Sequence, residues 1–126
     1  MVDCIILNGI QVYGYHGVNQ QEKDEGQIFS VNLEIEYDLE KAGSSDLMND
    51  TVDYSVLYSL VKSVLEGPSY NLLESVAGKI TEGITDTFAV KKVTVMVAKM
   101  DPPLSGASIG AAGVKITRDG ANRLID

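Results

Sequence analysis

The residue with the clearest chemical potential is a lysine at the end of a predicted buried strand. Val93, Val95 and Val97 alternate with other residues, and Lys99 shares their parity, so the lysine continues the apolar row. Burial disfavours the charged form of an amine, which suits it to general acid–base catalysis. Alternatively, the strand ends at residue 98 and the side chain extends to solvent. The pattern alone leaves both interpretations open.

Three further side chains could complete a site with Lys99. Glu74 follows Asn71 by three residues, the spacing of a capping box, although a carboxylate there could also clamp a guanidine-like edge with two hydrogen bonds. Tyr54 begins an apolar helical stripe, where an aromatic residue usually packs, but its phenol can also donate a proton. Glu22 belongs to a polar stretch, and solvated surface is its default interpretation.

Histidine and cysteine are too scarce for several common kinds of site. The chain has one histidine, His16, and one cysteine, Cys4. A zinc site would need mostly carboxylates, an internal disulfide cannot form, and no Ser/His/Asp pattern is present. His16 lies in a glycine-flanked turn and is predicted to be structural. Because the glycines match neither a phosphate loop nor a dinucleotide fingerprint, we expect neither a metal nor a cofactor.

The charge of the chain disfavours polyanionic partners. Lys and Arg number 10 against 18 Asp and Glu, so the net charge is −8. This charge repels a phosphate backbone and an anionic membrane surface, so we expect no nucleic acid and no membrane as partner. No apolar run approaches the ~20 residues of a membrane span, and the N-terminus does not resemble a signal peptide. A cytoplasmic protein is expected, which the lone cysteine also favours.

The elements that must position these side chains form one domain, residues 1–126, because 126 residues suffice for one core and not for two. Two helical stripes have Thr51 or Asp53 and then Asn71 as candidate N-caps, and Gly67-Pro68 ends the first. The predicted elements are strands over 4–15, with an interruption at Asn8-Gly9, and 29–39, helices over 56–65 and 72–88, and strands over 93–97 and 114–116. Between and after them, polar loops and a tail are predicted over 19–27, 42–50 and 118–126.

The order of these elements, β-β-α-α-β-β, indicates the fold class. Because the strands are grouped rather than alternating with single helices, the class is α+β with a four-stranded antiparallel sheet. Two helices can cover one face of that sheet. The other face carries Ser30, Asn32 and Glu34 and must meet water or a partner.

Five short motifs, in this order and at these separations, resemble the dihydroneopterin aldolase family over nearly the whole chain. Each motif is weak alone, whereas the set is highly specific. They are Tyr13-Gly14-Tyr15-His16-Gly17 followed by Glu22, Gly26-Gln27-Ile28-Phe29, Asp50-Thr51-Val52-Asp53-Tyr54, Asn71-Leu72-Leu73-Glu74, and Lys99 followed by Pro102-Pro103.

The resemblance implies the tunnelling fold, in which the β-β-α-α-β-β unit assembles with copies of itself. Four sheets close into a barrel with the helices outside, and two such tetrameric rings stack into an octamer. Closure removes the unpaired edges that a four-stranded sheet would expose. In this family the active site lies between adjacent subunits, so one chain alone is expected to be incomplete.

The same resemblance implies a substrate and a role for each candidate residue. The substrate is a pterin, 7,8-dihydroneopterin, cleaved by a retro-aldol reaction to 6-hydroxymethyl-7,8-dihydropterin and glycolaldehyde. The implied catalytic residues are Lys99 as general acid/base, Tyr54 as the phenol near the reacting side chain, and Glu22 near the substrate hydroxyls. The implied substrate-binding residues are Glu74, Leu73, Leu72, Asn71, Val52 and Asp53, with the Glu74 carboxylate on the 2-amino and N3 edge of the ring.

The implied chemistry needs neither metal nor Schiff base, because the C=N bond of the ring accepts the electrons that cleavage releases. A Glu22 carboxylate beside Lys99 would stabilise the charged amine, so Lys99 would act mainly as a cation or an acid, with water as the immediate base. Asn19, Asp53 and Ser105 depart from the usual family residues and touch the rim of the implied pocket.

Three other functions compete with aldol cleavage. An epimerase acting at C2′ of dihydroneopterin or its triphosphate shares the same bond cleavage, although few basic residues are available for a triphosphate. Oxygenation of the same substrate is disfavoured by the presence of Tyr54. A non-catalytic pterin- or purine-binding scaffold would need Glu74 but neither Lys99 nor Tyr54.

Overall fold

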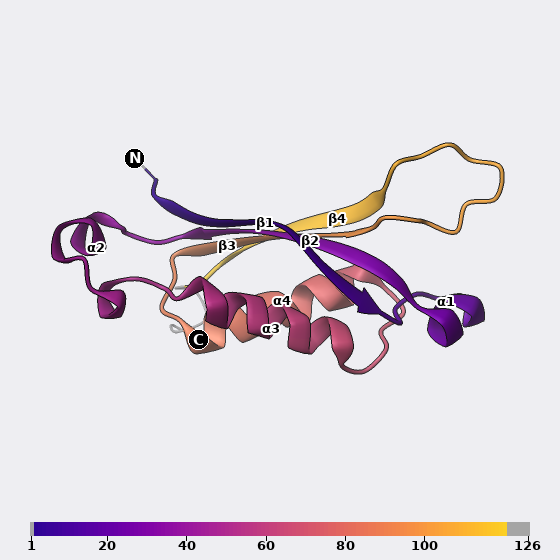
Figure 1. The fold of residues 1–126 in the computed structure, drawn as a ribbon, viewed down its shortest axis with the longest axis horizontal. Helices are drawn as coiled ribbons and strands as arrows, with labels where there is room; N and C mark the ends of the chain where they lie inside the picture. The colour runs from indigo at the N-terminus through magenta and orange to yellow at the C-terminus, as the bar shows by residue number, and fades with distance from the viewer. Residues whose placement is uncertain (1, 121–126) are drawn as a thin grey trace.

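The computed structural model describes residues 2–120, which form one antiparallel sheet with two long helices on one face (Figure 1). The strands lie in the order β1-β2-β3-β4, so β1 and β4 are the edges. Their bounds are β1 Cys4–Gly14, β2 Gln27–Glu36, β3 Lys92–Lys99 and β4 Ala112–Asp119. The helices are α3 Tyr54–Glu66 and α4 Leu73–Thr87. The predicted α+β class and element order are confirmed.

The alternation in β2 produces the buried face of the sheet. Phe29, Val31, Leu33 and Ile35 are fully buried, and the valines of β3 lie opposite the last three of them in the antiparallel register. The two helices close this core with apolar residues spaced three and four apart, namely Leu57, Val61, Leu65, Val76, Ala77, Ile80 and Ile84. No helix within residues 2–120 is long and apolar enough to cross a membrane.

The helix starts follow the predicted capping at one helix and not at the other. Asp53 caps α3, because its Oδ1 accepts the backbone N–H of Ser55 at 2.9 Å, and Gly67 ends the helix. The predicted Asn71 cap of α4 is wrong. The N-cap residue is Leu72 without a side-chain bond, and the Asn71 Oδ1 instead accepts from Lys23 Nζ at 2.6 Å. The Asn71 side-chain amide therefore binds Lys23 of α1 and does not bind a backbone N–H at the start of α4.

Two segments predicted as loops contain short helices. These are α1 Gln20–Glu25, α2 Glu40–Ser45 and the 3₁₀ helix η1 Met48–Asp50. A six-residue helix is too short to carry an apolar stripe, so hydrophobic periodicity misses it. The second strand ends at Glu36 rather than at residue 39, because Leu39 caps α2. In the predicted tail, residues 118 and 119 belong to β4, and 121–126 lie outside the described residues.

The predicted interruption at Asn8-Gly9 is a bulge within one continuous strand. The register between β1 and β2 shifts between Leu7 and Ile10, and Gly9 has a φ of 71°, in the region that favours glycine. Its N–H donates to the Asn32 Oδ1 at 2.6 Å, so a side chain of β2 satisfies the backbone group that the bulge frees.

His16 links the end of β1 to α3 and to the segment that precedes α4, which supports its predicted structural role. Its ring is buried, its Nε2 donates to the Leu65 carbonyl at 2.8 Å, and its Nδ1 accepts the Tyr70 backbone N–H at 3.1 Å. The ring also stacks on Tyr70 and meets the Phe29 ring edge-on. Because Nδ1 accepts, the imidazole is neutral. The histidine therefore fixes the end of α3 and the segment that leads into α4.

We expect His16 to make the stability depend on pH. Burial, foremost, and the charges of Lys23 and Lys99 lower the pKa of His16. As the pH falls below about 6.5, the unfolded chain binds this proton first, so the free energy of unfolding should drop by up to about 1.4 kcal/mol per pH unit. Urea unfolding at pH 7 and 5.5 measures this loss.

His16→Gln provides the control, because His16 is the one histidine of the chain. The variant should show almost no change in unfolding free energy over that pH interval. If the wild-type protein and the variant lost the same unfolding free energy over this interval, His16 would not be the source of the pH dependence.

Candidate active site

A partly buried ion pair joins the two catalytic candidates that lie farthest apart in the sequence. Lys99, the last residue of β3, places its Nζ 2.6 Å from the Glu22 Oε2. Their side chains are 15% and 6% exposed. The strand therefore extends through Lys99, and the side chain does not reach free solvent. The interpretation of Glu22 as solvated surface is wrong, because α1 turns this carboxylate inward.

The segments around α1 hold Glu22 in place. Its Oε1 accepts the Asn19 backbone N–H at 3.3 Å, and its Oε2 accepts the Gln27 Nε2 at 3.0 Å as well as Lys99. Gly17 has a φ of 151°, and a Cβ at this position would lie 2.2 Å from the Glu22 Oε1. Only glycine leaves room for the carboxylate against the backbone.

These donors decide the protonation state of Glu22. Burial by itself would raise the pKa of the carboxyl, but the hydrogen bonds from Lys99, Gln27 and the Asn19 backbone outweigh it, and the pKa is lowered. Glu22 is therefore an anion at neutral pH. The ion pair fixes the Lys99 ammonium group at this end of the sheet, where the two side chains can accept or return a proton.

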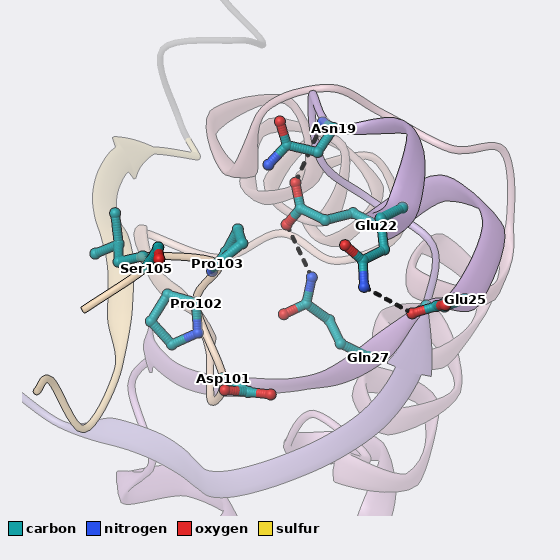
Figure 2. Close-up of a pocket in the computed structure, with 11 residues that line it drawn as sticks. Asn19, Glu22, Glu25, Gln27, Asp101, Pro102, Pro103 and Ser105 are labelled. Carbon is teal, nitrogen blue, oxygen red and sulfur yellow. Dashed lines mark hydrogen bonds between the residues drawn. The ribbon is translucent and has the colours of Figure 1, made fainter. Parts of the chain in front are cut away.

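A cavity of about 540 Å³ opens beside Glu22, between α1 and the segment that follows β3 (Figure 2). Figure 2 shows the Glu22 and Gln27 side chains pointing toward one another on one side, with Pro102 and Pro103 across from them. The cavity is lined by residues 19, 21, 22, 25–27 and 101–105. Asn19 and Ser105, two of the departures from the family pattern, belong to this lining.

The start of α4 lies at the same end of the molecule. Asn71 binds Lys23 of α1, and the Gly17 N–H donates to the Tyr70 carbonyl at 2.9 Å. These bonds bring four of the predicted binding residues to the end of the sheet that holds the ion pair. Glu74 and Leu72 are exposed there, Leu73 is half-buried, and Asn71 is exposed.

Val52, Asp53 and Tyr54 lie at the opposite end. Figure 1 shows α3 beginning near η1 and running toward the end where α1 lies. Thirteen helical residues span about 18 Å from Tyr54 to Glu66. Val52 is buried in the core, Asp53 is engaged as a helix cap, and Tyr54 is 67% exposed. One chain therefore gathers Lys99, Glu22 and the start of α4 but not Tyr54.

The part of the chain from residue 2 to residue 120 contains no group of three or more His, Cys, Asp or Glu side chains arranged to hold a metal ion. The side chains joined at the ion pair are a lysine, a carboxylate and an amide.

Gln27 is the site residue whose role the sequence reasoning missed. It begins the alternating row of β2 two residues before Phe29, and Phe29 lies opposite Lys99 in the sheet. Gln27 and Lys99 thus end two neighbouring apolar rows with polar side chains, and both bind Glu22. The parity that singled out Lys99 would also have found Gln27.

The sequence and the fold resemble those of known proteins. The sequence profile of the dihydroneopterin aldolase family matches residues 5–117. A dihydroneopterin aldolase from Staphylococcus epidermidis is 42% identical over 120 residues, covering 94% of this chain and 98% of its own. Among solved structures, an Escherichia coli dihydroneopterin aldolase in complex with neopterin superposes with a TM-score of 0.84 at 28% identity, covering 92% and 98% of the two chains. A Vibrio cholerae FolB protein superposes with a TM-score of 0.85 at 28% identity, covering 94% and 98%.

The sheet, its two covering helices and the element order are those of the tunnelling fold, as the sequence predicted. The chain belongs to the dihydroneopterin aldolase family and is an enzyme of the aldolase class.

We expect the Lys99–Glu22 ion pair to contribute more to the free energy of unfolding than an exposed ion pair elsewhere in this protein. A double-mutant cycle with Glu22→Gln and Lys99→Met should give a coupling energy of about 1.5–3 kcal/mol, because the hydrogen bond is charged and largely shielded from water. Urea unfolding at fixed protein concentration measures it.

Lys79 and Glu82, 3.9 Å apart and about half exposed on α4, form the control pair. Their coupling should be about 0.2–0.5 kcal/mol. Equal couplings for the two pairs would show that the Lys99–Glu22 contact is no stronger than a surface ion pair.

Proposed function

We propose that this enzyme cleaves 7,8-dihydroneopterin by a retro-aldol reaction to 6-hydroxymethyl-7,8-dihydropterin and glycolaldehyde, in the cytoplasmic folate pathway. The observation that carries the proposal is the shielded Lys99–Glu22 pair beside a cavity, in a chain of the dihydroneopterin aldolase family. The Escherichia coli relative binds neopterin, which supports a pterin with a hydroxylated side chain as substrate.

The reaction breaks the bond between C1′ and C2′ of that side chain. The C2′ hydroxyl loses its proton as its carbon becomes the carbonyl of glycolaldehyde, and the electron pair of the broken bond passes into the C=N of the ring. A proton then returns to C1′ to give the hydroxymethyl product. The protein must therefore supply a proton acceptor, a proton donor and a fixed position for the ring.

Lys99, Glu22 and Tyr54 take the proton-transfer roles. Lys99 is paired with an anionic Glu22, so it acts as a cation and an acid, and a water it positions takes the hydroxyl proton. Glu22 lines the cavity and accepts hydrogen bonds from the substrate hydroxyls. The Tyr54 phenol returns the proton to carbon. Its exposure leaves it free to enter a site built with another subunit.

The pterin ring is held at the start of α4. The Glu74 carboxylate accepts two hydrogen bonds from the 2-amino and N3 edge, a bidentate arrangement that fixes the ring plane. Glu74 lies exposed in the first turn of the helix, where the helix dipole also favours its negative charge. Leu73 contributes backbone groups, and Asn71 and Leu72 border the ring. Val52 contributes backbone groups and Asp53 borders the ring from the adjacent subunit, because both residues lie at the opposite end of the chain.

Neither a metal nor a Schiff base takes part. The ring C=N supplies the electron sink that a metal ion or an iminium provides in other aldolases. The scarcity of histidine and cysteine and the ion pairing of the Lys99 amine support this chemistry. The same cleavage followed by readdition of glycolaldehyde in the other orientation adds some C2′ epimerase activity.

The functional unit is a ring of four copies, stacked in pairs as an octamer, with each active site between subunits. The open edges of β1 and β4 support ring closure, because pairing them removes unpaired backbone groups. Tyr54 and Lys99 lie at opposite ends of one chain, which favours a site that takes one residue from each of two subunits.

Incubation of the enzyme with 7,8-dihydroneopterin, followed by chromatography, tests the reaction. We expect glycolaldehyde and 6-hydroxymethyl-7,8-dihydropterin, unchanged by a metal chelator. Lys99→Ala should lower kcat by about 100-fold or more, because a proton-transfer group is lost, while neopterin affinity changes little.

Lys92→Ala, at the other end of β3, is the control and should keep kcat near the wild-type value. Inverted substrate alone would indicate an epimerase, and an oxidised product an oxygenase. Binding without any product would indicate a scaffold, and inhibition by the chelator would contradict the metal-free mechanism.

Mixing two inactive variants tests the shared site. Lys99→Ala and Tyr54→Phe subunits combined in equal amounts should recover activity, because about a quarter of the interfaces would join an intact Lys99 to an intact Tyr54. Turnover is measured before and after subunit exchange, with oligomer mass from analytical ultracentrifugation. Failure to recover any activity in verified mixed oligomers would place the site within one chain.

A further inference from the structure

The bulge in β1 places an asparagine directly before a glycine on an edge strand. Asn8 and Gly9 stand opposite Asn32 of β2, at the point where the β1–β2 register shifts. Both residues are exposed, and within one chain no further strand covers the outer edge of β1. Asn8 is also the one asparagine of the chain that a glycine follows. The bulge therefore combines an exposed side-chain amide with the least hindered backbone nitrogen that can follow it.

The surroundings leave room for the Asn8 side chain to close a ring with the next backbone nitrogen. Gly9 has a φ of 71°, and a Cβ built on it would meet no atom within 4 Å. The Asn8 side chain makes no hydrogen bond within residues 2–120. No bond of its own therefore holds the Asn8 amide away from the Gly9 nitrogen.

The reaction open to this pair is deamidation through a succinimide. The Gly9 nitrogen loses its proton to solvent and attacks the Asn8 side-chain carbonyl carbon. A C–N bond forms there, the bond from this carbon to the amide nitrogen breaks, and ammonia leaves with a proton taken from water. A second water molecule then opens the ring at either carbonyl and leaves aspartate or isoaspartate. Water is the co-reactant, and nothing is oxidised or reduced.

One hydrogen bond opposes the first step. The Gly9 N–H donates to the Asn32 Oδ1 at 2.6 Å, so the nitrogen that must attack is directed, with its proton, toward β2. The sheet fixes Asn32 itself, which pairs with Met96 of β3. Before Gly9 can lose its proton and turn toward the Asn8 side chain, this bond must break. The cost of breaking it adds to the barrier of ring closure.

We propose that Asn8–Gly9 is a site of spontaneous deamidation and that the Asn32 side chain restrains the reaction by holding the Gly9 N–H. The product adds a negative charge to edge strand β1 of an already acidic chain. Isoaspartate also inserts one carbon into the backbone of the strand. The inference concerns the fold and does not depend on the proposed catalytic activity.

The test compares the rate of deamidation at Asn8 in the folded wild-type protein and in Asn32→Leu, which keeps the size of the side chain and removes the acceptor. At mildly alkaline pH the variant should react about fivefold faster, the effect of one neutral hydrogen bond. Peptide mapping by mass spectrometry measures aspartate and isoaspartate at Asn8. Sedimentation checks that both proteins have the same oligomeric state, because pairing of β1 with another copy would also slow the reaction.

Three controls isolate the hydrogen bond. Ser30→Ala changes the same face of β2 two residues away and should keep the wild-type rate. In urea the wild-type and Asn32→Leu chains should react at one common rate, because the bond is absent from both. Asn8→Gln should abolish the product at this position. If Asn32→Leu does not fold, Asn32→Val, whose β-branched side chain suits a strand, takes its place under the same criteria.

Equal rates in the folded wild-type protein and the folded Asn32 variant would overturn the inference. So would a reaction that occurs in the unfolded chains and in neither folded protein, because the strand rather than Asn32 would then prevent it. Faster deamidation of the variant at another asparagine, with Asn8 unchanged, would also contradict the assignment of the site.

Discussion

Burying the Glu22 carboxylate requires hydrogen-bond donors around it, and much of the local structure serves to supply them. Lys99 approaches from β3, Gln27 from β2, and the Asn19 backbone from the start of α1. Gly17 allows the chain to pass close to the carboxylate oxygen. Removing any of the three donors would leave a charged group shielded from water without full compensation.

This constraint connects the core of the sheet to the site. The apolar rows of β2 and β3 bury their side chains against α3 and α4, and each row ends in a polar residue at the same edge of the core. His16 fixes the adjoining turn by bonding the end of α3 and the segment before α4. The hydrophobic core therefore positions polar groups at its boundary, where a cavity gives a ligand access to them.

The same geometry explains why a single chain holds only part of the proposed machinery. A helix of thirteen residues keeps its two ends apart, so residues at the start of α3 cannot reach groups near its end. Edge strands that can pair with other copies offer a way to bring such residues together without lengthening the chain. Assembly and catalysis would then be coupled, with the position of Tyr54 at an exposed helix start as the link.

The sequence by itself determined the elements whose patterns are local. Alternation indicated the buried face of β2, the helical stripes indicated α3 and α4, and Gly67 marked the end of α3. Parity made Lys99 a candidate for the core side of β3, but the structure was needed to show that the strand extends through it. Tertiary structure alone decided that Glu22 is buried, that Asn71 binds Lys23 instead of capping α4, and that the short helix α1 exists. The physical reason is the range of the interactions: periodicity reports which face of an element is apolar, whereas Glu22 and Lys99, 77 residues apart, meet only when the packed sheet brings the ends of its strands beside α1.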